Sequence, residues 1–154
     1  MTFAIVVFRV TNDGLLDVNV LFALLHPGHL HSRIAQDWLD RQLEPSSILI
    51  CRVVQMGALR LLTMPSVMRE DVKSSREFWA GWEEVMRDER FEFVEEPLSF
   101  EVVWKSICVQ LPRGSTGNTD TYLAAFTQSG GHTLVTFDSG FRRFQRLSVE
   151  LLHP

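Results

Sequence analysis

The chain has few cysteines and no cysteine pair. Cys51 and Cys108 are the only two, and they lie far apart in the sequence, each among apolar neighbours. We therefore expect reduced, buried and unreactive thiols, which suits a cytoplasmic protein. Disulfides and a cysteine-based zinc site are excluded, so the 154 residues must build their core by apolar packing alone.

Long apolar runs are absent as well. No stretch approaches the roughly 18 consecutive apolar residues that suggest a membrane-spanning helix. The first ten residues, MTFAIVVFRV, are mostly apolar, but the stretch is short and contains Arg9. It lacks the basic start and the small-residue cleavage site of a signal peptide. We expect no membrane segment.

An excess of positive charge is the third absence. Lysine and arginine number 15 against 19 aspartates and glutamates, which gives a net charge of −4. Nucleic-acid-binding domains are usually basic, because neutralising phosphates supplies most of their non-specific affinity. Any contact with a nucleic acid must therefore use a local basic patch, or metal ions that reverse the sign of a carboxylate cluster.

Repeats and interdomain linkers are missing too, and what remains is an alternation of short apolar strands with amphipathic helices. This pattern predicts an α/β fold, a three-layer α/β/α sandwich with a mainly parallel sheet of about five strands. We expect one domain over residues 14–154, preceded by an N-terminal extension or extra strand at residues 1–13. Strands are predicted at 15–21, 47–51, 91–94, 132–137 and 149–152, and helices at 29–43, 53–62, 74–87, 99–109 and 119–128.

Three aspartates occupy positions where such folds place active sites, at the carboxyl ends of strands. Asp17 lies within the first apolar strand, close to where that strand must leave the core, and Asp138 directly follows the fourth strand. Asp120 opens a helix, with Asn118 or Thr119 as its expected N-cap. If the first and fourth strands are neighbours, the three carboxylates converge. Oxygen ligands without histidine or cysteine suit Mg²⁺ or Mn²⁺.

Such a cluster has a definite chemical use. Cutting a phosphodiester requires a nucleophilic water and stabilisation of the charge that develops on the phosphate, and carboxylate-bound metal ions supply both. Taken singly, Asp120 is also explained as a first-turn acid and Asp138 as a turn residue. Asp17 is harder to explain structurally, because a carboxylate in an apolar strand is costly. The combination of the three favours a metal site.

The motifs around these aspartates resemble the PIN-domain family, specifically the VapC toxins of bacterial toxin–antitoxin pairs. A D-x-N start, a TD-x-YLAAF helix and a TFD-x-GF turn occur in this order, and the resemblance runs from about Gly14 to the C-terminus. The matching segments are LLDVNVLFALLHPGHLHSRIAQDWL from Leu15, ILICRVVQMGALRLLTMPSVM from Ile48, TDTYLAAF from Thr119 and LVTFDSGFRRF from Leu134.

The resemblance implies a Mg²⁺- or Mn²⁺-dependent endoribonuclease that cleaves RNA, is neutralised by a VapB-type antitoxin and forms a homodimer. It assigns the catalytic, metal-binding acids to Asp17, Asp120 and Asp138. Asn19 matches the polar partner of the first aspartate, and Thr136 matches the threonine that positions the end of the last motif strand. Transfer, ribosomal and messenger RNA all remain open as substrates.

One position departs from the family pattern. Where the family commonly has a glutamate on the helix after the second strand, this chain has Gln55, whose amide can hold a metal-bound water but brings no charge. Several arginines lie near the motifs and could hold RNA phosphates or an antitoxin carboxylate, or simply face solvent. They are Arg52, Arg60, Arg113, Arg142, Arg143 and Arg146.

Two other functions fit parts of the sequence. Gln55 is compatible with a catalytically decayed PIN-fold binding module. A haloacid-dehalogenase-type phosphatase also begins with an aspartate at the end of its first strand. That phosphatase needs a second acid two residues later, where this chain has Asn19, and a later lysine. The only lysines, Lys73 and Lys105, lie outside any matching motif.

Overall fold

Five parallel strands form one sheet in the computed structural model, which describes residues 13–153. The strand order is β3-β2-β1-β4-β5, and every neighbouring pair is parallel. The strands are β1 (Gly14–Leu16), β2 (Ile48–Ile50), β3 (Phe91–Phe93), β4 (Thr133–Thr136) and β5 (Val149–Leu151). The predicted α/β class with a parallel five-stranded sheet is confirmed.

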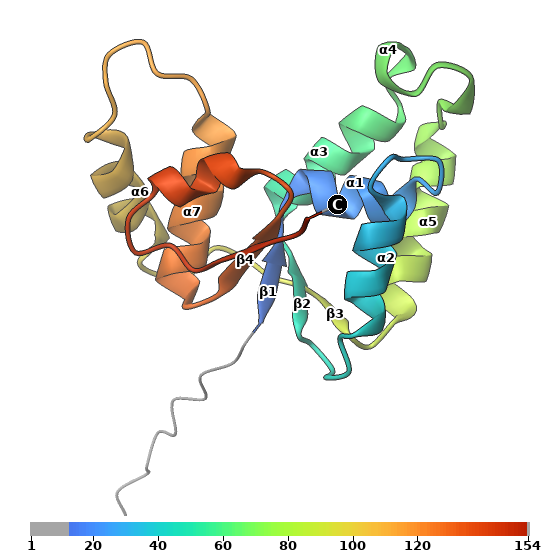
Figure 1. Cartoon of the computed structure of the whole chain (residues 1–154), viewed down its shortest axis with the longest axis horizontal. Coiled ribbons are helices and arrows are strands. Elements are labelled where there is room, and N and C mark those ends of the chain that lie inside the picture. The colour runs from blue at the N-terminus through green and yellow to red at the C-terminus, as the bar shows by residue number, and fades with distance from the viewer. Residues whose placement is uncertain (1–12, 154) are drawn as a thin grey trace, which may run out of the picture.

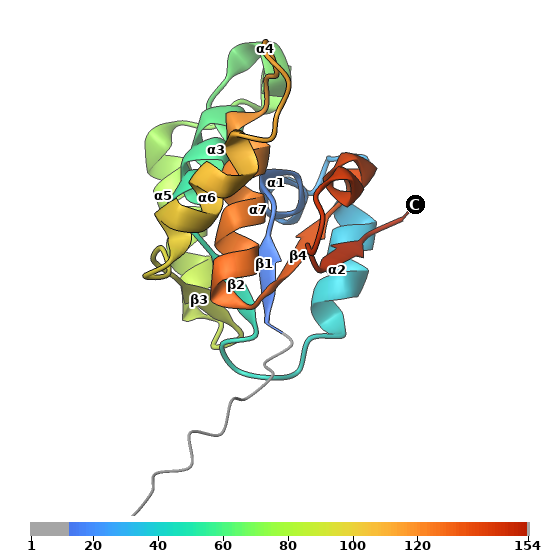
Figure 2. The ribbon, with the colours of Figure 1, turned by 90° about the vertical axis from the view of Figure 1, so that its left-hand side faces the viewer.

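Helices cover both faces of this sheet. Figure 1 shows α6 and α7 on one side and α1, α2, α3 and α5 on the other. α6 and α7 pack side by side, as the view in Figure 2 also shows. The helices are α1 (Val18–Leu25), α2 (Ser32–Asp40), α3 (Arg52–Leu62), α4 (Pro65–Met68), α5 (Ser75–Arg87), α6 (Phe100–Cys108) and α7 (Asn118–Gly130), with 3₁₀ helices η1 (Arg69–Asp71) and η2 (Ser139–Arg143).

The first strand is shorter than predicted. It ends at Leu16, and residues 18–25 form a helix where a strand over 15–21 was expected. Asp17 causes the change of structure, because its backbone is extended and its side chain caps the new helix by accepting a hydrogen bond from the Val18 amide at 2.7 Å. A short apolar run does not by itself distinguish a strand from a buried helix.

The cap of α7 also differs from the prediction. Gly117 is the N-cap, with a φ of +106° that favours glycine, and Asn118 and Thr119 are already helical. Asp120 therefore lies in the first turn of α7, next to the free backbone amides. From Thr121 to Thr127 every residue of this helix is buried, so α7 holds Asp120 on a fixed support.

The core surrounds the central strands, where Leu15, Leu16 and Leu134 have no exposed surface. Cys51 is buried, and burial raises the pKa of its thiol to about 11, as expected for an unreactive cysteine. Cys108 is exposed, so the prediction of two buried cysteines was wrong for that residue: it ends α6 at the surface.

None of the helices within residues 13–153 is long and apolar enough to cross a membrane. The predicted N-terminal extension, residues 1–13, lies outside the described residues except for Asp13.

Candidate metal centre

The candidate site lies where β1 and β4 end side by side. The two strands are paired in register from Gly14 opposite Thr133 to Leu16 opposite Val135. The chain runs from β1 through β2 to β3 on one side of β1, and β4 and β5 lie on the other side of β1. The boundary between β1 and β4 is therefore the switch point of the strand order. The Asp17 amide donates to the Val135 carbonyl at 2.9 Å, which fixes Asp17 beside the end of β4.

A single hydroxyl links the residues of this edge. Thr136 Oγ1 donates to Asp17 Oδ2 at 2.7 Å and accepts from the Asp138 amide at 3.0 Å and from Asn19 Nδ2 at 3.3 Å. The Asn19 amide oxygen accepts from the Phe137 amide at 3.3 Å. Thr136 is fully buried, so the hydroxyl holds the Asp17 carboxylate and the backbone of Asp138 in one network.

Asp17 is a buried acid among other acids. Its residue is 8% exposed, and burial raises the pKa of the carboxyl from 3.8 to about 6. Hydrogen bonds from Thr136 and Val18 lower this pKa, while the charges of Asp120 and Asp138 raise it further. Within residues 13–153 no arginine, lysine or histidine forms an ion pair with Asp17 or Asp138.

Asp120 has a cationic partner instead. Its Oδ2 accepts a hydrogen bond from Arg143 Nη2 at 2.8 Å, and Arg143 Nη1 donates to the Gly140 carbonyl at 3.0 Å. A Cβ atom added to Gly140 would lie 2.9 Å from Asp138 Oδ1 and 3.1 Å from Arg143 Nη1. Gly140 therefore leaves open a small space that Asp138 and Arg143 share.

The three aspartates converge only in part. Among the described residues, no three carboxylate, imidazole or thiol side chains lie close enough to hold an ion together. Asp17 and Asp138 are joined through Thr136, whereas Asp120 is turned to Arg143. The carboxylates are nevertheless near enough to raise the pKa of Asp17.

The donor set fits a hard divalent cation. Asp17, Asp120 and Asp138 offer only carboxylate oxygens, which Mg²⁺ and Mn²⁺ prefer. A cation between them would also supply the positive charge that the buried Asp17 lacks, and it would reverse the repulsion that raises the Asp17 pKa. Asp17 and Asp138 would hold the ion from their shared network, and Asp120 would join them on exchanging Arg143 for the ion.

Gln55 is buried at 5% exposure on α3, but its partner is an arginine. Its Oε1 accepts a hydrogen bond from Arg52, and the Arg52 guanidinium lies 4.4 Å from the centre of the Phe93 ring. Among the described residues none of the three aspartates bonds to Gln55. Its proposed supporting role for the metal stays a prediction.

The other arginines that the sequence singled out differ in their surroundings. Arg60 lines a cavity of about 470 Å³ together with Val18 and Thr119, the chain neighbours of Asp17 and Asp120. Arg113 and Arg142 are exposed, and neither forms an ion pair within the described chain. Arg143, one residue from Arg142, is the arginine that contacts an aspartate of the site. From the sequence alone Arg142 and Arg143 could not be told apart. Which side chain of a short 3₁₀ helix faces the site depends on tertiary packing.

A model of the PIN domain matches residues 14–147, and the chain belongs to this family. It is similar to ribonuclease VapC41 of Mycobacterium tuberculosis, with 34% identity over 142 residues that cover 90% of this chain and 97% of that protein. Ribonuclease VapC29 of the same organism is 32% identical over 126 residues, covering 82% of this chain and 86% of the relative.

Solved structures share the fold at lower identity. VapBC2 from Rickettsia felis, bound to a DNA fragment from its promoter, gives a TM-score of 0.67 at 15% identity and covers 91% of this chain and 98% of that one. VapC20 of Mycobacterium tuberculosis, a toxin that cleaves the sarcin-ricin loop, gives 0.62 at 17% identity, with 84% and 93% covered. At these identities the likeness establishes the fold.

Proposed function

We propose that this chain is a VapC-type toxin, a Mg²⁺- or Mn²⁺-dependent endoribonuclease. The observation that carries the proposal is the edge formed by Asp17, Thr136 and Asp138, where a buried carboxylate with a pKa of about 6 has no cationic partner among the described residues. Similarity to two ribonucleases over most of the chain supports RNA as the substrate.

When bound, the divalent ion would stabilise the charge that develops on the phosphate and lower the pKa of an attacking water. The residues of the chain hold the metal-binding groups in place. Thr136 and Asn19 hold Asp17 and the Asp138 backbone, so little reorientation is required of these groups when substrate arrives. Asp120 projects from the first turn of the buried helix α7.

We also propose a VapB-type antitoxin as partner and the cytoplasm as the compartment. Solved relatives of this fold are VapBC assemblies, from Rickettsia felis and Salmonella typhimurium, which supports the antitoxin.

A homodimer is proposed as well. Exposed apolar side chains on and beside α3, α4 and α5, namely Met56, Val67, Val72 and Trp79, support it. Light scattering tests the dimer, and a strict monomer at high concentration contradicts it.

The catalytic proposal is tested by cleavage of a labelled RNA with and without divalent metal. We expect cleavage with Mg²⁺ or Mn²⁺, none in excess chelator, and a loss of at least ~100-fold in Asp138→Asn. Asp37→Asn is the matched control, because Asp37 is exposed on α2 and is none of the three aspartates of the site, so this variant should retain full activity.

Two outcomes would contradict the proposal. Cleavage that persists in chelator would show that the reaction needs no divalent metal. Full activity of Asp138→Asn would show that the aspartate cluster is not catalytic. A chain that binds an antitoxin yet never cleaves RNA would favour the decayed binding module instead.

A further inference from the structure

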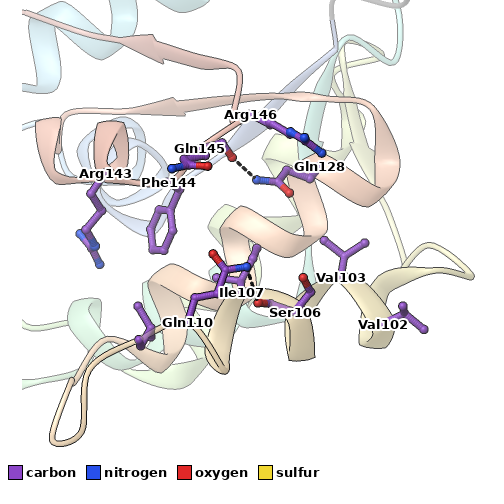
Figure 3. Close-up of a pocket in the computed structure, with 11 residues that line it drawn as sticks. Val102, Val103, Ser106, Ile107, Gln110, Gln128, Arg143, Phe144, Gln145 and Arg146 are labelled. Atoms are coloured by element: carbon purple, nitrogen blue, oxygen red, sulfur yellow. Dashed lines mark hydrogen bonds between the residues drawn. The ribbon is translucent and has the colours of Figure 1, made fainter.

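A groove beside the acid cluster has no part in holding the metal. It lies between α6, α7 and the turn after η2, and its volume is about 620 Å³ (Figure 3). Arg143 lines this groove and also bonds to Asp120 at 2.8 Å, so the groove begins at the edge of the candidate metal centre. Its polar lining consists of Ser106, Gln110, Gln128, Arg143, Gln145 and Arg146.

The charge of this groove is opposite to that of the chain. The protein has a net charge of −4, yet among the described residues that line the groove two are arginines and none is an aspartate or glutamate. A positive groove on an acidic protein is a local attraction for a polyanion, of the kind that overall composition does not provide.

The two arginines are positioned by the fold. Arg146 has a φ of +60°, a conformation that is rare and costly for a residue other than glycine. Gln128 Nε2 holds this turn by donating to the Gln145 carbonyl at 2.8 Å, the contact drawn in Figure 3. The Arg143 guanidinium lies 4.5 Å from the centre of the Phe144 ring. Both cationic groups therefore stand on supported backbone at the rim of one groove.

We propose that this groove binds the single-stranded RNA next to the scissile phosphate, a proposal that rests on the ribonuclease function above. Arg143 contacts the backbone phosphate nearest the aspartates, and Arg146 contacts a second phosphate further along the groove. The glutamine amides, which both donate and accept, face sugar hydroxyls and base edges. The volume falls in the ~300–1,000 Å³ range of small-ligand pockets, large enough for a nucleotide unit.

Arg146→Gly provides a test that separates binding from folding. Glycine adopts a positive φ without strain, so this variant should melt at or above the temperature of the wild type. It removes one phosphate contact, so the affinity for RNA should fall and the slope of log K against log salt should shrink by about 0.7. The probe is a fluorescently labelled single-stranded RNA of mixed sequence, followed by anisotropy in chelator, where the RNA stays uncut.

Arg146→Gln and Arg76→Gln form the matched pair, because both remove one charge from an exposed arginine and only Arg146 lines the groove, Arg76 lying on α5. Arg146→Gln should weaken binding as Arg146→Gly does, and Arg76→Gln should change it little. Wild-type affinity and salt slope in both Arg146 variants would overturn the proposal, as would an equal loss in Arg76→Gln. Cleavage of the same RNA by the wild type with Mg²⁺, measured in parallel, shows in either case whether the ribonuclease function itself stands.

Discussion

At the scale of single residues, Asp17 links the local structure to the proposed chemistry. The same carboxylate ends β1, caps α1 and accepts the Thr136 hydroxyl. Its burial is unfavourable for a charged group, which is why its pKa is raised to about 6. A residue that costs stability at this position is typical of a functional site rather than of packing.

This cost predicts a pH-dependent effect of Asp17→Asn in chelator. Between about pH 4 and pH 6 the folded protein keeps a proton on Asp17 that the unfolded chain has lost. The free energy of unfolding of the wild type therefore falls as the pH rises through this window, by on the order of 3 kcal/mol. The amide side chain of the variant carries no such charge but can still cap α1, so the variant should melt higher than the wild type at pH 7 and similarly at pH 4.

Melting curves of both proteins across this pH range check the prediction, and the difference between them isolates Asp17 from other titrating groups. Asp37→Asn serves again as the control, with no change expected. A variant that is less stable than the wild type at pH 7 in chelator would show that Asp17 stabilises the fold as a charge.

Sequence alone identified part of the site. Asp17 and Asp138 were predicted together because they lie at the ends of two apolar strands, and Thr136 was assigned by the family resemblance. The strand pairing brings the three into one network. The pairing of Asp120 with Arg143 was not predicted, since it joins the start of α7 to a 3₁₀ helix 23 residues later. Gln55 was placed with the metal, although Arg52, three residues earlier in α3, was a partner that helical spacing offered.

At the scale of elements, the contact between α1 and α3 supports the position of Asp17. Gly57 makes this contact possible, because a Cβ at that position would lie 2.7 Å from Val18 Cγ2 and 2.9 Å from Val18 Cγ1. Val18 directly follows Asp17, so any shift of α1 away from α3 would move the aspartate. Residues 18–21, the first half of α1, were predicted as part of a strand over 15–21 because a short apolar run satisfies both patterns.

Two helical glycines should respond oppositely to alanine. Gly57→Ala gains helix propensity of about 1 kcal/mol but must displace the half-buried, β-branched side chain of Val18 between two packed helices, so we expect net destabilisation of about 1–2 kcal/mol. Gly81→Ala on α5 meets no atom within 4 Å and should stabilise by about 0.5–1 kcal/mol. Denaturant unfolding of both variants measures the signs, and stabilisation by Gly57→Ala would show that α1 and α3 do not approach this closely.

At the scale of the whole molecule, the strand order determines where the acids gather. Alternation of strands and helices in the sequence predicted a parallel sheet with two helical layers. That prediction is confirmed, and the central strands β1, β2 and β4 are the ones buried between the helices. The order β3-β2-β1-β4-β5 could not be read from the pattern. It puts β1 beside β4 and so brings Asp17 to Thr136 and Asp138 across 119 residues of chain or more.

The net charge of −4 must also be reconciled with an RNA substrate at the scale of the whole molecule. An acidic chain can act on RNA if its carboxylates hold cations and some of its exposed arginines lie beside them, as Arg143 and Arg146 do at the groove next to Asp120.

The proposed function depends above all on Asp17, Asp120 and Asp138 holding a divalent ion together, and calorimetric titration with Mn²⁺ in the absence of RNA is the sharpest test of this. We expect saturable binding by the wild type, with proton release near pH 6 as the ion displaces the proton of Asp17. Each of Asp17→Asn, Asp120→Asn and Asp138→Asn should weaken binding by at least ~10-fold, and Asp37→Asn should leave it unchanged. A wild type that takes up no Mn²⁺, or three aspartate variants that bind it as the wild type does, would show that these acids form no metal site.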